Sequence, residues 1–102
     1  MHNITVEELK KRMDAGEKLN IIDCREPHEY AEYNIGAKLI PLGQIQSMQL
    51  DDIEDWKDEE VIVHCRSGHR SMMACVFLDT LGFKDTKNLA GDILAWKEKY
   101  DN

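Results

Sequence analysis

The chain has 102 residues, which is enough for one hydrophobic core and too few for two. Its 42% apolar content is typical of a globular protein, and 13 basic against 20 acidic residues give a net charge of −7. This charge disfavours nucleic acids and anionic membranes as partners, because both repel a net anion. Any basic site must therefore be local.

Neither a leader nor a membrane segment is expected from the sequence. The N-terminal stretch MHNITVEELKKRM lacks the apolar core of a signal peptide, and the longest uncharged apolar run, MMACVFL, is too short to cross a bilayer. Cys24, Cys65 and Cys75 are an odd number of cysteines without the spacing of a disulfide framework. We therefore expect a cytoplasmic domain with reduced thiols.

Helices alternate with strands in the first part of the chain. Thr5 and Glu8 form a capping-box pattern, and Gly16 can end the helix that follows. Pro27 suits the first turn of a brief helix. In chain order the pattern predicts a helix, a strand, a brief helix and a strand over residues 4–16, 18–23, 25–33 and 37–42.

The same alternation continues to the C-terminus. Residues 42–50 are compatible with a helix, and the acidic run 51–60 is interpreted as a solvated connection anchored by Ile53 and Trp56. The next elements are a strand, a helix, a strand and a helix, over residues 61–65, 71–82, 85–90 and 92–100. The helix over 71–82 is apolar almost all round, so we expect it to be well buried. The alternation predicts an α/β domain with a parallel sheet.

Cys65 stands where the short strand 61–65 meets a loop that leads into the next helix. In open α/β sheets, ligands bind beyond the carboxyl ends of the strands. Backbone N–H groups of a tight loop and of the first helical turn favour an anion, and they stabilise a cysteine there as a thiolate. We therefore predict attack by the Cys65 thiolate on a small anionic substrate, which forms a covalent intermediate.

The loop after Cys65 is basic although the chain is acidic. Arg66 and Arg70 add positive charge, His69 is a third contributor, and Gly68 permits the backbone angle of a tight turn. The alternative is that Cys65 only ends a core strand and that the arginines are solvated. A glycine and two arginines within five residues of a cysteine, at a strand-to-helix turn, favour the reactive interpretation.

Four segments in order resemble the rhodanese-like sulfurtransferases. They are Cys-Arg-Ser-Gly-x-Arg-Ser at 65–71, IIDCREPHEY at 21–30, IGAKLIPL at 35–42 and NLAGDILAW at 88–96. The resemblance covers nearly the whole chain. It implies a single rhodanese-like domain over residues 1–102, of the α/β class, with a five-stranded, mostly parallel sheet flanked by helices on both faces.

The resemblance also implies an activity. In that family the loop cysteine takes sulfane sulfur from a donor such as thiosulfate as a persulfide and passes it to cyanide or a thiol. By this resemblance Cys65 is the sulfur carrier, and the donor's anionic end is bound by Arg66, Ser67, Gly68, His69 and Arg70. Neither a cofactor nor a metal is implied. Glutathione and a thioredoxin-like protein both fit as thiol acceptors, and the sequence does not choose between them.

Further residues are expected to support this loop. Asp23 and Arg25 are interpreted as a structural ion pair behind the site rather than as substrate contacts, and Ser71 as a supporting residue. His64 is expected to be a hydrogen-bonded strand residue, because a thiolate stabilised by the loop needs no general base. Cys24 is interpreted as a buried strand residue rather than a resolving thiol.

Two departures from the family pattern lie outside the cysteine loop. YNIGA at 33–37 is one residue shorter than the family's segment and lacks its histidine, so the connection before Leu39 differs. Asp92 stands where the family usually has a second glycine, so the resemblance does not fix the conformation of that turn. We expect neither change to touch the cysteine loop.

Three other functions fit part of this pattern. Cysteine phosphatases use a similar loop, but their signature has five residues between cysteine and arginine, whereas four separate Cys65 from Arg70. A sulfur-carrier or partner-binding module loaded by another protein would share Cys65. Zinc binding by His64, Cys65 and His69 is disfavoured, because neighbouring strand residues point to opposite faces and no Cys-x-x-Cys pair is present.

Overall fold

The computed structural model describes residues 1–66 and 69–101. Within these residues five strands form one sheet in the order β1-β5-β4-β2-β3, and each neighbouring pair is parallel. The strands are β1 (His2–Ile4), β2 (Ile21–Asp23), β3 (Lys38–Leu39), β4 (Glu60–His64) and β5 (Asp85–Leu89). The helices are α1 (Val6–Asp14), α2 (Pro27–Glu32), α3 (Leu42–Gln46), α4 (His69–Thr80) and α5 (Asp92–Tyr100), with a 3₁₀ helix η1 (Asp51–Trp56) before β4.

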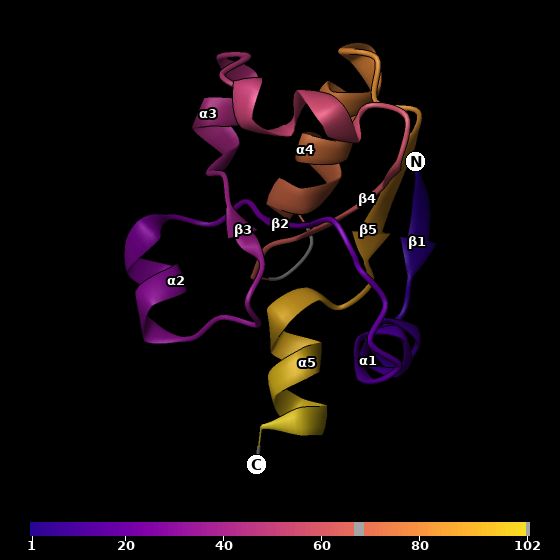
Figure 1. The fold of residues 1–102 in the computed structure, drawn as a ribbon. Coiled ribbons are helices and arrows are strands. Elements are labelled where there is room, and N and C mark those ends of the chain that lie inside the picture. Colours follow the sequence, from indigo (N-terminus) through magenta and orange to yellow (C-terminus); the bar gives the residue numbers. More distant parts are fainter. Residues whose placement is uncertain (67–68, 102) are drawn as a thin grey trace.

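Helices cover both faces of the sheet, as Figure 1 shows, with α3 and α4 on one side and α1 and α5 on the other. Each face is buried in its own apolar cluster. Val61 and Val63 of β4 belong to the cluster under α3, α4 and η1, whereas Ile62 belongs to the cluster under α1 and α5. This alternation is the two-residue period of a strand with both faces covered. The predicted fold class is confirmed.

Local signals in the sequence set several boundaries. The Thr5 hydroxyl accepts the Glu8 N–H at 3.0 Å, and the Glu8 carboxylate accepts the Thr5 N–H at 3.4 Å, which is the predicted capping box. Gly16 follows α1 with a φ of 79°, a conformation that favours glycine. Pro27 is the first residue of α2. The sequence therefore correctly predicted how these two helices begin and where the first one ends.

The first strand, β1, was not among the elements predicted from the pattern. It has three residues at the edge of the sheet, two of them exposed, and pairs only with β5 in the described residues. Such a short edge strand shows too little alternation to be recognised. It supplies the fifth strand that the family resemblance implied.

The expectation that the apolar helix after Cys65 would be well buried is wrong for one of its faces. Buried α4 side chains, such as Cys75 and Leu78, pack on the sheet, but Met72, Met73 and Val76 are 50%, 46% and 59% exposed. The sheet covers a single side of α4, so uniform hydropathy did not reveal which side faces solvent. This helix also begins at His69, two residues before the predicted start.

Candidate active site

Cys65 lies directly after β4, the strand between β2 and β5, and is only 1% exposed. Its backbone N–H donates to Asp92 Oδ1 at 2.8 Å, and its carbonyl accepts the Ile93 N–H at 3.1 Å. The backbone of Cys65 is therefore clamped to the start of α5. These two hydrogen bonds fix the position of the Cys65 backbone at the end of β4, before the chain turns towards α4.

The contact between Asp92 and Cys65 corrects the expectation that the departure at position 92 leaves the cysteine loop untouched. Asp92 has a φ of 53°, and Gly91 before it has a φ of 81°. A Cβ at Gly91 would lie 2.5 Å from Ala95 Cβ, so the first position requires glycine. Aspartate is among the residues that tolerate the left-handed region. The departure thus keeps the turn and places a carboxylate against Cys65.

A buried polar network surrounds the Cys65 thiol. Cys65 Sγ lies 3.5 Å from Ser71 Oγ, and this hydroxyl lies 2.5 Å from Asn88 Oδ1 and 3.1 Å from Asp92 Oδ1. Burial raises the pKa of Asp92 to about 6; the hydrogen bond from the Cys65 N–H opposes this shift, and negative charge on Cys65 adds to it. Ser71, predicted as a supporting residue, therefore contacts the thiol.

Cys24 lies directly after β2, the neighbour of β4, and is fully buried in the same apolar cluster as Cys65. The prediction of burial is confirmed. A side-chain hydrogen bond with Cys65 and burial together raise the pKa of the Cys24 thiol. Cys75 is also fully buried in this cluster, on α4, and burial raises its pKa to about 12.

Asp23 and Arg25 form the expected ion pair. Arg25 Nε donates to Asp23 Oδ1 at 2.9 Å and Nη2 to Oδ2 at 2.7 Å, and both side chains are almost completely buried. Arg25 Nη2 also donates to the Tyr33 carbonyl at 2.7 Å, which ties the end of α2 to the end of β2. Guanidinium and carboxylate match in a planar, two-bond geometry. The pair therefore braces the edge of the sheet from which the site is built.

Arg70 has a partner that the sequence did not reveal. Its Nη1 and Nη2 donate to the two Glu29 carboxylate oxygens at 2.6 and 2.9 Å, joining the start of α4 to α2. This contact lowers the pKa of Glu29 to about 2 and raises that of Arg70. The charge of Arg70 is thus partly neutralised beside the site. No sequence motif signalled this pair, because its members lie 41 positions apart in the sequence.

The other loop residues are placed in part. Arg66 and His69, at the two described ends of the loop, are exposed. The backbone carbonyl of Arg66 accepts a hydrogen bond from the Leu94 N–H at 3.3 Å. Ser67 and Gly68, predicted as substrate-binding residues, lie outside the described residues. The structure therefore describes the two ends of the predicted anion-binding loop.

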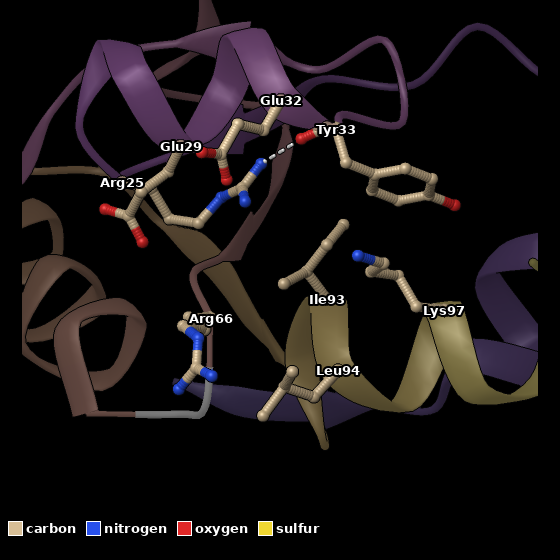
Figure 2. A pocket seen from close by; sticks show the side chains of 8 residues that line it. All are labelled: Arg25, Glu29, Glu32, Tyr33, Arg66, Ile93, Leu94 and Lys97. Atoms are coloured by element: carbon tan, nitrogen blue, oxygen red, sulfur yellow. Dashed lines mark hydrogen bonds between the residues drawn. The ribbon is translucent and has the colours of Figure 1, made fainter.

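A pocket of about 290 Å³ adjoins Arg66 between α2 and α5 (Figure 2). It brings together side chains of both charges. Its lining residues are Arg25, Glu29, Glu32, Tyr33, Arg66, Ile93, Leu94 and Lys97. Lys97 Nζ also lies 4.8 Å from the centre of the Tyr33 ring. The pocket therefore presents apolar, cationic and anionic side chains together next to the cysteine loop.

His64 is fully buried at the end of β4. Burial lowers its pKa, and its Nε2 lies 3.7 Å from Asp23 Oδ2. His64 Nδ1 lies 3.4 Å from the Cys65 carbonyl oxygen, as expected of a hydrogen-bonded strand residue. The His64 side chain lies on the opposite face of β4 from Cys65, as alternation along the strand requires.

In residues 1–66 and 69–101, no three histidine, cysteine, aspartate or glutamate side chains gather where they could hold a metal ion. Across the same part of the chain, no helix combines the length and apolar character needed to span a bilayer.

The residues that sequence reasoning missed are Asp92 as a contact of Cys65, Asn88 in the polar network and Glu29 as the partner of Arg70. A signal existed for Asp92 alone, since a charged residue replaces a glycine there in an otherwise apolar segment. Asn88 is a polar residue inside a strand, but nothing in the sequence linked it to position 71. Its role follows from the parallel order of β4 and β5.

Fold and site together define an α/β domain with a cysteine at the carboxyl end of a central parallel strand. The family model for the rhodanese-like domain matches residues 5–99. The chain is 42% identical over 96 residues to the putative sulfurtransferase YtwF of Bacillus subtilis, covering 92% of this chain and 88% of that protein. The protein therefore belongs to the rhodanese-like family.

Other relatives and solved structures agree with this assignment. A sulfurtransferase of Allochromatium vinosum is 35% identical, with 94% of this chain and 88% of that protein covered. The putative sulfur carrier protein YrkF of Bacillus subtilis is 34% identical over 94% of this chain, which spans about half (51%) of its length. The crystal structure of a rhodanese-like domain protein from Staphylococcus aureus has a TM-score of 0.79 at 33% identity, covering 94% and 91% of the two chains.

Proposed function

We propose that the protein is a sulfurtransferase that carries sulfane sulfur as a persulfide on Cys65. The donor is a small anion such as thiosulfate, or a related persulfide or polysulfide, and the acceptor is cyanide or a thiol. The observation that carries this proposal is the position of Cys65 at the carboxyl end of β4, directly before the loop and α4. Relatives described as sulfurtransferases support the reaction class.

The transfer takes two displacements at sulfur. The Cys65 thiolate attacks the outer sulfur of thiosulfate, a bond forms between the two sulfurs, and sulfite leaves with the electron pair of the broken bond. The acceptor thiolate then attacks the outer sulfur of the persulfide, and the Cys65 thiolate leaves. Both the donor and the loaded cysteine are anionic, so the positive charge of Arg66 and Arg70 favours binding at this loop.

The pocket beside Arg66 supports a thiol acceptor of the glutathione type. Among its lining residues, Arg66 and Lys97 can bind carboxylates, and Glu32 can bind an ammonium group. A short peptide thiol bears groups of both kinds. A thioredoxin-like protein is the other acceptor that we propose, in a reducing compartment such as the cytoplasm, where the three cysteines stay reduced.

Sulfur transfer from thiosulfate to cyanide and to glutathione tests this function. We expect the Cys65→Ser variant to lose both reactions while remaining folded, and the Cys75→Ser variant to keep them. Cys75 is the matched control because it is a buried thiol in the same apolar cluster. Transfer at the wild-type rate by Cys65→Ser would contradict the proposed mechanism.

The same assays separate the two competing functions. A cysteine phosphatase would hydrolyse an aryl phosphate and fail to move sulfur, and this result would replace our proposal. A pure carrier domain, as the name of the relative YrkF suggests for that protein, would accept sulfur from a partner protein but not from thiosulfate. Direct loading by thiosulfate, followed by transfer to a small thiol, favours the enzyme.

A further inference from the structure

We propose that Cys24 is a resolving thiol, which attacks a persulfide on Cys65 when no acceptor arrives, releases sulfide and leaves a disulfide between Cys24 and Cys65. The inference rests on the proposed function, because it needs Cys65 to carry sulfur. It gives the persulfide-loaded enzyme a second reaction, sulfide release, besides transfer of sulfur to an acceptor.

The register of the sheet places the two cysteines opposite each other. Asp23 of β2 pairs with His64 of β4, so Cys24 and Cys65 each lie one residue beyond that pair. The Cys24 N–H donates to the His64 carbonyl at 3.0 Å, so the two chains are still joined at this level. Neighbouring strands lie about 4.8 Å apart, within the range of about 4.4 to 6.8 Å between the Cα atoms of a disulfide.

The side chains also point to the same place. Alternation along the strands puts Cys24 and Cys65 on the face that packs against α3 and α4, and both belong to the apolar cluster there. They are 0% and 1% exposed, and interaction with the Cys65 side chain is the largest cause that raises the pKa of the Cys24 thiol. Two thiols at facing positions of neighbouring strands, on the same face of the sheet, can meet by side-chain rotation.

The backbones on both sides are fixed near this geometry. The Cys24 carbonyl accepts the Leu42 N–H at 3.1 Å, and the Cys65 carbonyl accepts the Ile93 N–H at 3.1 Å. A nucleophile held beside its target reacts as in a unimolecular step, with an effective concentration far above that of any free thiol. The arrangement therefore favours reaction within the chain over reaction with another molecule at the buried inner sulfur.

The proposed step balances in atoms and electrons. Cys24 Sγ forms a bond with Cys65 Sγ, and the bond between Cys65 Sγ and the outer sulfur breaks. The outer sulfur keeps the electron pair and takes the Cys24 proton, so a thiol and a persulfide anion become a disulfide and hydrosulfide. The two cysteines are together oxidised by two electrons, and the sulfane sulfur is reduced to sulfide. A dithiol reductant then restores both thiols by exchange.

The surroundings of Cys24 make this step slow. Only a thiolate is a good nucleophile, and interaction with the Cys65 side chain, together with burial, raises the pKa of Cys24 and so favours its protonated form. An acceptor that reaches the outer sulfur therefore competes successfully. Sulfide release takes over when acceptors are scarce, which prevents the protein from remaining loaded.

The test follows a loaded chain without an acceptor. Reduced wild-type protein and the Cys24→Ser and Cys75→Ser variants are treated with thiosulfate, freed of it, and quenched at intervals with an alkylating agent in denaturant. Serine at position 24 can still donate a hydrogen bond but cannot form a disulfide, and Cys75→Ser controls for the loss of a buried thiol in the same cluster.

We expect the wild type and Cys75→Ser to gain one sulfur atom, then lose it as sulfide and yield a peptide that joins Cys24 to Cys65. Cys24→Ser should gain the sulfur and form no disulfide. A loaded wild type that keeps its sulfur, with Cys24 still alkylated, overturns this inference without a variant being needed. Equal sulfide release from Cys24→Ser overturns it too. If none of the three proteins gains sulfur, the proposed function itself fails, and the inference fails with it.

Discussion

Replacing Asp92 with asparagine should remove a pH dependence from the stability of the fold. Asp92 is fully buried, its Oδ1 accepts the Cys65 N–H, and its Oδ2 has no hydrogen-bond partner among the described residues. Burial raises the pKa of this carboxyl to about 6, from an ordinary value of 3.8. At about 1.4 kcal/mol for each pH unit, the difference corresponds to about 3 kcal/mol.

The sign follows from which state binds the proton more tightly. Below pH 3.8 the Asp92 carboxyl is protonated in both states and contributes no difference. Between pH 3.8 and about 6 the unfolded chain loses its proton first, so the folded state becomes relatively less stable as the pH rises. Asparagine cannot ionise. Relative to wild type, Asp92→Asn should therefore gain roughly 2 to 3 kcal/mol in the free energy of unfolding between pH 4 and pH 7.

Urea unfolding of both proteins under reducing conditions, across this pH range, measures the effect. The comparison cancels every titration that the two proteins share, including that of Glu29. Asp92→Gly is a useful second variant, because glycine also accepts a φ of 53° but offers no acceptor to Cys65. It should lose the same pH dependence. A difference in the free energy of unfolding between wild type and Asp92→Asn that is the same at all pH values would refute the raised pKa of the buried Asp92 carboxyl.

Two ion pairs give the remaining predictions. Arg25→Ala leaves the buried Asp23 carboxylate unpaired and should lower the free energy of unfolding by about 3 to 5 kcal/mol, measured by urea unfolding, whereas Arg12→Ala, which breaks a more exposed pair, should cost clearly less. Glu29→Gln removes the carboxylate that holds Arg70 and should lower the KM for thiosulfate, whereas Arg70→Ala should raise that KM roughly tenfold. Unchanged thiosulfate kinetics in both variants would contradict a role for Arg70 in binding the donor.

The parts of the fold that the sequence predicted are those with strong local signals. The Thr5 capping box, Pro27 at the start of α2 and the β-branched run before Cys65 each mark a boundary through chemistry within a few residues. Short or one-sided elements carry weaker signals. Thus β1 was missed, and the exposed face of α4 was expected to be buried.

For the site, the sequence located Cys65 but not what surrounds it. Asp92, Glu29 and Cys24 reach the site from α5, α2 and the end of β2, so their contacts depend on how distant segments pack. Motif spacing describes neighbours along the chain and does not contain this information. The contact of Cys24 with Cys65 needed the pairing of β2 with β4, which hydropathy does not specify.

The central claim is that Cys65 carries the transferred sulfur atom as a persulfide. Intact-protein mass spectrometry immediately after thiosulfate treatment, with peptide mapping of the product, tests it most directly. We predict the mass of one added sulfur atom, located on Cys65, removable by a thiol and absent from Cys65→Ser. Added sulfur on Cys75 instead, or the same added mass in Cys65→Ser, would contradict the account.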